Sequence, residues 1–253
     1  DEKCQETRQL VLDMIDWDCE VKTLFREENL GCGLAVSQAI TWFFEHVEIG
    51  IILEDDCYPH LSFFEFCEKM LDYYKEDEEV MHISGGSYLP PKHFNKDTYY
   101  FSKYPFVWGW ATWQNAWNKY DLNIQESHDF IEKVHSSKHE QKYWQNIYKN
   151  IKNGKLDTWD WIWNFTLWNH RGISLNSTRN RIKNIGFNSS ATHTKSPSWI
   201  YAKIPFAKET KLIVNHPSHK KINKQADQLV FSYYNLGAIP FFVKFKNWIY
   251  GRL

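Results

Sequence analysis

The stretch Ile49-Gly-Ile-Ile-Leu53, followed at once by Glu54-Asp55-Asp56, decides the predicted fold. An unbroken apolar run of this length is typical of a strand that is buried on both faces of a parallel sheet. Apolar residues at helical spacing flank it over residues 36–47 and 63–74, and Val80–Ser84 has the pattern of a further strand. This order predicts parallel pairing through right-handed crossovers. We therefore expect an α/β protein with a mostly parallel, Rossmann-like central sheet flanked by helices.

The elements outside this stretch are less regular. Val21-Lys-Thr-Leu-Phe25 predicts a short strand, and Ser62 with Glu65 predicts a capping box at the start of the helix that follows the acidic residues. A Trp-rich helix is predicted over residues 157–169, with Asp157 as its N-cap. We expect one domain over residues 1–195 and a C-terminal extension of undefined structure over residues 196–253.

The composition excludes several classes of protein. The 253 residues carry 30 basic and 31 acidic side chains, so the net charge of −1 gives no overall electrostatic reason to expect binding to nucleic acid. The apolar runs are far shorter than a membrane span. Five cysteines without paired zinc-ligand spacings favour free thiols in a cytoplasmic protein. Aromatic residues make up 17% of the chain, which suits a large core or surfaces that stack on sugars.

The acidic triplet Glu54-Asp55-Asp56 is the first candidate site. Carboxylates at the end of a buried strand raise each other's pKa unless something neutralises them. Hard oxygen ligands at the end of a strand suit Mg²⁺ or Mn²⁺ held jointly with substrate phosphates. The alternative is a solvated loop whose Asp residues cap the next helix.

Asp160, between Trp159 and Trp161, is the second candidate. Aromatic neighbours that exclude water would raise its pKa toward the range of a general base. Asp160 would also be the third residue of its predicted helix, where the helix dipole alone favours a carboxylate. The spacing by itself does not decide between these two interpretations.

Two further segments are candidates. Lys183 and His193, with Arg179 and Arg181, form a basic segment that could clamp a diphosphate and complete a metal site, although a lone His is more often an ordinary loop residue. An aromatic segment is either core or a platform for a sugar on the acceptor side, where a glycine would let backbone approach a ligand. Its residues are Trp108, Gly109, Trp110 and Trp113.

The order of these segments resembles glycosyltransferases of the GT-A fold, and most closely bacterial nucleotide-diphospho-sugar transferases that are similar to the N-acetylglucosaminyltransferase I family. The resemblance covers about residues 21–194. The matching stretches are Asn29-Leu-Gly-Cys-Gly33, Gly50-Ile-Ile-Leu-Glu-Asp-Asp-Cys57, Val107-Trp-Gly-Trp-Ala-Thr-Trp113, Trp159-Asp160-Trp161, and Asn184-Ile-Gly186 through Ala191-Thr-His-Thr194.

The resemblance implies an inverting, metal-dependent transfer of a sugar from a nucleotide sugar, UDP-linked in this family, to a glycan or glycolipid hydroxyl. It implies that Asp56 is the principal ligand of Mn²⁺ or Mg²⁺, while Glu54 and Asp55 contact ribose or metal-bound water. Asp160 matches the catalytic base, although Trp161 stands where the eukaryotic relatives have a second Asp. His193 has no counterpart in those relatives, but a downstream histidine ligates the metal in many other GT-A enzymes.

The front of the chain departs from the family, because the acidic triplet begins only 53 residues from the start. A β-α-β unit takes about 30 residues, so the resemblance implies that one such unit is missing and leaves open whether this chain alone is active. Residues 1–18 would then form the helix that follows the second strand.

Two rival functions remain open: a sugar-phosphate nucleotidyltransferase and a carbohydrate-binding protein without chemistry. The tail, residues 238–253, mixes aromatic and basic residues, which suits either peripheral contact with an anionic membrane on its cytoplasmic side or a segment docked on the core.

Overall fold

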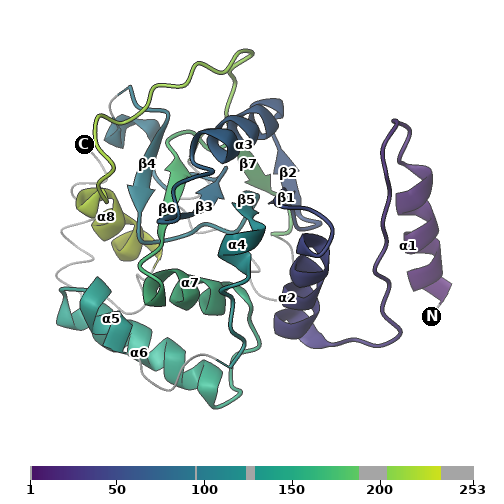
Figure 1. Ribbon diagram of the computed structural model, residues 1–253, viewed down its shortest axis with the longest axis horizontal. Coiled ribbons are helices and arrows are strands. Elements are labelled where there is room, and N and C mark those ends of the chain that lie inside the picture. The colour runs from purple at the N-terminus through teal and green to yellow at the C-terminus, as the bar shows by residue number, and fades with distance from the viewer. Residues whose placement is uncertain (1, 95, 124–128, 188–203, 235–253) are drawn as a thin grey trace.

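A five-stranded sheet forms the centre of the protein (Figure 1). The computed structural model describes residues 2–94, 96–123, 129–187 and 204–234. Within them the strand order is β1-β5-β3-β6-β4. The bounds of these strands are Ile49–Ile52 for β1, Trp110–Trp113 for β5, Val80–Ser84 for β3, Ile173–Ser177 for β6 and Tyr99–Ser102 for β4.

The expectation of a mostly parallel sheet is wrong. Only β3 and β6 pair in parallel, whereas β5 pairs antiparallel with both β1 and β3, and β4 pairs antiparallel with β6. The expected crossover from β1 to β3 does exist, because both run antiparallel to β5 and therefore in the same direction. They are not neighbours, because β5 lies between them. The Trp-rich segment that contains β5 was not predicted to form a strand.

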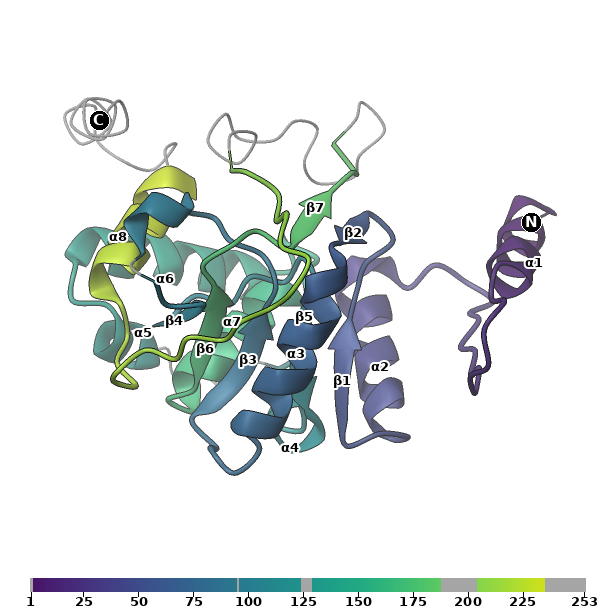
Figure 2. The ribbon, with the colours of Figure 1, turned by 90° about the horizontal axis from the view of Figure 1, so that it is seen from above.

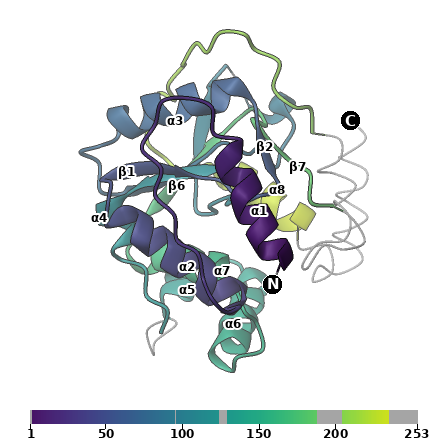
Figure 3. The same ribbon diagram turned by 90° about the vertical axis from the view of Figure 1, so that its right-hand side faces the viewer.

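Helices cover both faces of the sheet (Figure 3). The helix α3 (Leu61–Tyr73) packs on one face against β3 and β5. The helices α2 (Gly31–Phe44), α4 (Gln114–Trp117) and α7 (Asp160–Asn169) lie on the other. Outside α7 lie α5 (Asp129–Val134) and α6 (Lys138–Lys152). The result is a layered, mixed α/β architecture with helices on both faces, as expected, around a sheet that is mostly antiparallel.

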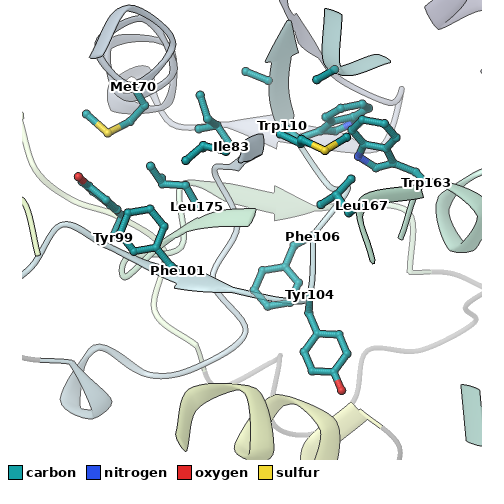
Figure 4. Packing of buried hydrophobic residues seen from close by; sticks show 14 of the residues in the cluster. Met70, Ile83, Tyr99, Phe101, Tyr104, Phe106, Trp110, Trp163, Leu167 and Leu175 are labelled. Atoms are coloured by element: carbon teal, nitrogen blue, oxygen red, sulfur yellow. The ribbon is translucent and has the colours of Figure 1, made fainter. Parts of the chain in front are cut away.

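The core is aromatic and lies around β3 and β5. His82 stacks on Trp110 and accepts a hydrogen bond at Nδ1 from Trp163 Nε1 at 3.1 Å, and burial lowers the pKa of His82 to about 3. Trp110 and Trp163 lie side by side on the α7 side of the sheet, as Figure 4 shows. On the other side Met70 of α3 lies close to Ile83. The tryptophan content of the chain therefore serves mainly to fill this core.

A second, two-stranded sheet positions the candidate site. It pairs β2 (Cys57–Pro59) antiparallel with β7 (Ile182–Asn184), and Figure 2 shows it beyond the end of β1. The residues that follow β1 are thereby brought against a segment more than 120 positions later in the chain.

The N-terminal arm, residues 2–30, stands away from the rest of the molecule (Figure 2). Its helix α1 (Glu2–Asp13) buries no side chain. The predicted strand at residues 21–25 is wrong, because this segment is extended but pairs with no strand of the described chain. Its apolar side chains stay largely in solvent, since Val21 is 46% and Phe25 is 47% exposed. The strand β1 is correspondingly an edge of the sheet, with Ile49 51% exposed, so the expectation that it is buried on both faces is also wrong.

The C-terminal part of the described chain packs on the sheet. The helix α8 (Lys224–Tyr234) contacts β4. Earlier in the chain, a short 3-10 turn, η1 (Pro91–His93), precedes β4. Asp227 of α8 accepts a hydrogen bond from Ser102 Oγ at 2.6 Å. In the described part of the chain, no helix combines the length and apolarity that crossing a membrane requires. Residues 238–253, for which either membrane contact or docking on the core was expected, lie outside the described residues.

Candidate functional site

The acidic triplet lies in the turn that joins the end of β1 to β2. The turn is closed by a hydrogen bond from Cys57 N to Glu54 O at 3.0 Å. Glu54 and Asp56 are half-buried, whereas Asp55 is exposed. The predicted place at the end of β1 is therefore observed, although that strand is an antiparallel edge strand rather than a central parallel one.

The segment after β7 holds Asp56 in place. Asn184 Nδ2 donates to Asp56 Oδ2 at 3.0 Å, and Ile185 N donates to Asp56 O at 2.8 Å. A Cβ atom at Gly186 would lie 2.4 Å from Asp56 Oδ2, so only glycine leaves room for this carboxylate. The Glu54-Asp55-Asp56 and Asn184-Ile-Gly186 motifs, which are far apart in sequence, thus form one structural unit.

Glu54 has a strongly perturbed carboxyl group. Burial raises the pKa of Glu54 from 4.5 to about 7, and the negative charges of Asp56, Asp160 and Asp55 contribute to that rise after burial. The segment of Asp160 lies near the end of β1, because Trp110 pairs with Ile52 and stacks on Trp159. A carboxyl group with a pKa near 7 exchanges its proton readily at neutral pH.

Asp160 is the first residue of α7 and is held between anchored aromatic side chains. Trp159 is 2% exposed and stacks on Trp110, while Trp161 packs edge-on against Trp144 with ring centroids 5.2 Å apart. The hydroxyl of Thr158 donates a hydrogen bond to Asp160 Oδ1. The backbone around Asp160 is therefore fixed by the core, which suits a group that must be held in one orientation.

The predicted cap of this helix is wrong. The N-cap of α7 is Trp159, not Asp157, and the Asp157 carboxylate instead accepts hydrogen bonds from Cys32 N and Gly33 N at the start of α2. The predicted capping box at α3 is wrong in a similar way, because His60 is its N-cap and accepts from Ser62 N at 3.2 Å. At α3 a different side chain caps the helix end, whereas the N-cap residue of α7 makes no side-chain cap hydrogen bond.

Most of the predicted aromatic platform is core. Trp110 is 0% and Trp113 is 6% exposed, so neither ring offers a face to a sugar. Gly109 lies against the buried Ile182, where a Cβ atom would not fit, so this packing explains the glycine and no nearby ligand is needed to explain it. Trp108 remains as the half-buried member of the segment, in contact with the rings of Tyr88 and Phe187.

The basic segment does not gather at the triplet. Arg181 is buried, and its Nη2 forms an ion pair with Glu209 Oε1 at 2.9 Å. Its positive charge is therefore neutralised inside the fold by Glu209. Lys183 is exposed at the middle of β7, where strand alternation directs it away from the face on which Asn184 meets Asp56. His193 lies outside the described residues.

Two residues of the site were missed by sequence reasoning. The pKa of the Cys32 thiol is raised by burial and by the charges of Glu54, Asp160 and Asp157. The pKa of the Tyr120 hydroxyl is raised by burial and to a lesser extent by the charge of Asp160. Cys32 belongs to the matching stretch Asn29-Leu-Gly-Cys-Gly33 but was given no role, and no pattern marked Tyr120. Both reach the site through the packing of α2 and of the segment after α4.

The donor atoms suit a divalent cation that is shared with a substrate. Among the described residues no group of three His, Cys, Asp or Glu side chains could hold a metal by itself. The triplet does offer hard carboxylate oxygens, and Mg²⁺ is commonly bound by one or two carboxylates together with substrate phosphates. The residues therefore fit the protein's share of such a site.

A large cavity of about 1290 Å³ lies elsewhere, between α5, α6 and α8. None of the predicted site residues lines it, and its walls carry both acidic and basic groups, including Lys103, Glu140 and Asp227.

Comparison with known proteins adds no candidate for either place. No protein-family model matches the chain, and no curated protein is significantly similar to it.

Proposed function

We propose that this protein is a metal-dependent, inverting glycosyltransferase that moves a sugar from a nucleoside-diphosphate sugar to the hydroxyl of a glycan or glycolipid. The observation that carries the proposal is that Trp110 links the two segments, because it pairs with Ile52 at the end of β1 and stacks on Trp159, the neighbour of Asp160; the charge of Asp160 also contributes to the raised pKa of Glu54. Transfer needs a diphosphate-binding group and a base near one anomeric carbon, and these two segments provide carboxylates for both.

The carboxylates of the acidic triplet and the carboxylate of Asp160 have different roles in the proposed reaction. Asp56, held by Asn184, supplies the carboxylate that faces the donor diphosphate, and Glu54 and Asp55 border the same space. Asp160 takes the proton from the acceptor hydroxyl while the acceptor oxygen forms its bond to the anomeric carbon. The bond from that carbon to the diphosphate oxygen breaks on the opposite face, and its electron pair leaves with the diphosphate, so the configuration inverts.

The proposed reaction also needs a divalent cation, and we place it in a particular compartment of the cell. Mn²⁺ or Mg²⁺, when bound with the donor, offsets the charge that develops on the leaving diphosphate. We place the reaction in a reducing compartment, on the cytoplasmic side of the cell, because all five cysteines are free thiols. The proposed acceptor side is bordered by Trp108, the half-buried ring of its segment.

The test is a product assay with the purified chain. UDP-, GDP- and dTDP-linked sugars are supplied with Mn²⁺ or Mg²⁺, and released nucleoside diphosphate is measured. We expect Asp160→Asn to lower turnover by about 100-fold or more while nucleotide affinity stays close to that of the wild type. Asp56→Asn should weaken cation-dependent donor binding itself. Asp72→Asn is the matched control, since Asp72 is an exposed carboxylate on α3.

Other products would contradict the proposal. Release of pyrophosphate from a nucleoside triphosphate and a sugar phosphate would identify a nucleotidyltransferase. Binding of glycans without turnover of any donor would identify a carbohydrate-binding protein. Equal loss of turnover and nucleotide affinity in Asp160→Asn would assign Asp160 to the structure of the helix start rather than to the chemistry.

A further inference from the structure

The start of α2 is held by a carboxylate that lies far away in the sequence. Asp157 Oδ2 accepts from Cys32 N and Asp157 Oδ1 accepts from Gly33 N, both at 2.8 Å, across 125 and 124 positions of the chain. The first N–H groups of a helix have no partner within the helix. Leu30, at the N-cap position, has no side-chain acceptor for them. Asp157 therefore caps α2 from another segment.

The segment of Asp157 and Thr158 packs closely against Gly33 in the first turn of α2. A Cβ atom at Gly33 would lie 2.5 Å from Asp157 Oδ1 and 3.1 Å from Thr158 N. Glycine at this position thus lets the segment before α7 lie directly on the first turn of α2. The negative charge of Asp157 is also favoured there by the α2 dipole.

The same short segment carries Asp160. Thr158 donates to Asp160 Oδ1, and Trp159 is buried against Trp110, so the segment is fixed at its far end by the core. Its near end, residues 152–157, is exposed. Backbone hydrogen bonds to α6 hold residues 153–155, so the Asp157 carboxylate is the side-chain contact that holds the last part of this exposed stretch, three residues before the proposed base.

We propose that Asp157 is a positioning residue for Asp160: by holding residues 157 and 158 on the first turn of α2, it fixes the direction of the Asp160 carboxylate toward the triplet. This inference rests on the proposed function, because it gives Asp160 the role of base. Asp157 itself touches neither substrate nor reacting atoms. Without it residues 157 and 158 are no longer held on the first turn of α2, and the hydrogen bond from Thr158 no longer fixes the orientation of Asp160.

The kinetic test uses Asp157→Ala and the milder Asp157→Asn. Displacing a base by about 1 Å costs on the order of 100-fold in rate, so we expect kcat to fall by about 10- to 100-fold while the KM for the donor stays nearly constant. Gly33→Ala should reproduce this loss, because its added Cβ displaces an unaltered Asp157 carboxylate. Combined with Asp157→Ala it should add little further loss, since both changes break one contact.

The matched control is Asn223→Ala. Asn223 Oδ1 accepts from Ala226 N at 3.0 Å at the start of α8, so it caps a helix far from the triplet. Loss of a cap lowers the melting temperature by about 2–4 °C in a chain of this size, and we expect this shift in both Asp157→Ala and Asn223→Ala. Only Asp157→Ala should lower kcat.

A second readout does not depend on turnover. Cys32 lies within electrostatic range of Asp160, so removing that charge with Asp160→Asn should speed alkylation of Cys32 by iodoacetamide. Mass spectrometry follows Cys32 separately from the other four thiols. If Asp157 positions Asp160, the acceleration caused by Asp160→Asn should disappear in the Asp157→Ala background.

The outcomes separate the two proposals. Loss of the Cys32 response without turnover of any donor in the wild type would refute the proposed function but keep the positioning role. Normal kcat and KM in a folded Asp157→Ala variant, with the Cys32 response intact, would show that Asp157 is only a cap and would overturn the inference. If Asp157→Ala fails to fold, Asp157→Asn and Gly33→Ala decide by the same two measurements.

Discussion

Replacing Glu54 by glutamine should remove a pH-dependent loss of stability. The pKa of Glu54 is about 7 in the folded protein and 4.5 as its ordinary value. Between these pH values the folded state holds a proton that the unfolded state has released, so the free energy of unfolding falls as pH rises through this window and is constant above it. A glutamine side chain has no proton to lose in this range, and the Glu54→Gln variant should lack this slope.

The size of the effect follows from the same two values. At about 1.4 kcal/mol per pH unit, the difference between 4.5 and about 7 corresponds to about 3 kcal/mol. Water around the half-buried carboxyl group screens part of the charge repulsion, so we expect about 1–3 kcal/mol. The advantage of Glu54→Gln over the wild type should grow by this amount between pH 4.5 and about pH 8.

The assay is urea denaturation at several pH values with a chelator present, so that no divalent cation neutralises the cluster. Glu68→Gln is the control, because Glu68 is exposed on α3. Stability curves of the wild type and Glu54→Gln that run parallel across the whole range would refute the reasoning. Added Mn²⁺ should raise the stability of the wild type at about pH 8 more than that of Glu54→Gln, since binding to the folded state alone stabilises it.

Three further changes test the fold and the site. Gly186→Ala places a Cβ atom 2.4 Å from Asp56 Oδ2, so cation-dependent nucleotide binding measured by calorimetry should weaken by about 10-fold; unchanged binding would separate Asp56 from the donor site. Trp110→Ala should cost about 3–5 kcal/mol in urea denaturation, because a fully buried ring is lost; a cost below about 1 kcal/mol would contradict the packing. Deleting α1, which buries nothing, should move the melting temperature by less than about 2 °C; a larger fall would show that the arm contacts the core in solution.

The local pattern of the chain was sufficient for much of the secondary structure. A strand at residues 49–53, a helix over residues 63–74 and the strand β3 were all predicted, and all three elements are observed. The helix buries Phe63, Cys67 and Met70 as expected, but Phe64 is 42% exposed. Their periodicity reports which side chains are buried, and burial along a helix or strand is a property of neighbouring residues. The place of the acidic triplet at the end of β1 followed from the same pattern.

Strand neighbours were decided by the tertiary structure. Whether β1 pairs with β3 or with β5 depends on where Trp110–Trp113 packs, and a strand rich in tryptophan has the same local pattern whether it lies inside a sheet or in an aromatic cluster. The insertion of β5 changed the sheet from parallel to mostly antiparallel without changing the order of elements along the chain.

The helix caps and the assembly of the site were also tertiary outcomes. Sequence spacing marked Asp157 as a cap, and the family resemblance implied that Asp56 is a metal ligand. Their partners, Gly33 for Asp157 and Asn184 for Asp56, come from segments more than 120 residues away. A hydrogen-bonding side chain satisfies whichever unpaired group lies nearest in space. The sequence by itself thus marked the carboxylates to which the proposed chemistry is assigned, whereas the fold decided which other predicted residues lie beside them and which, such as Trp110, belong to the core.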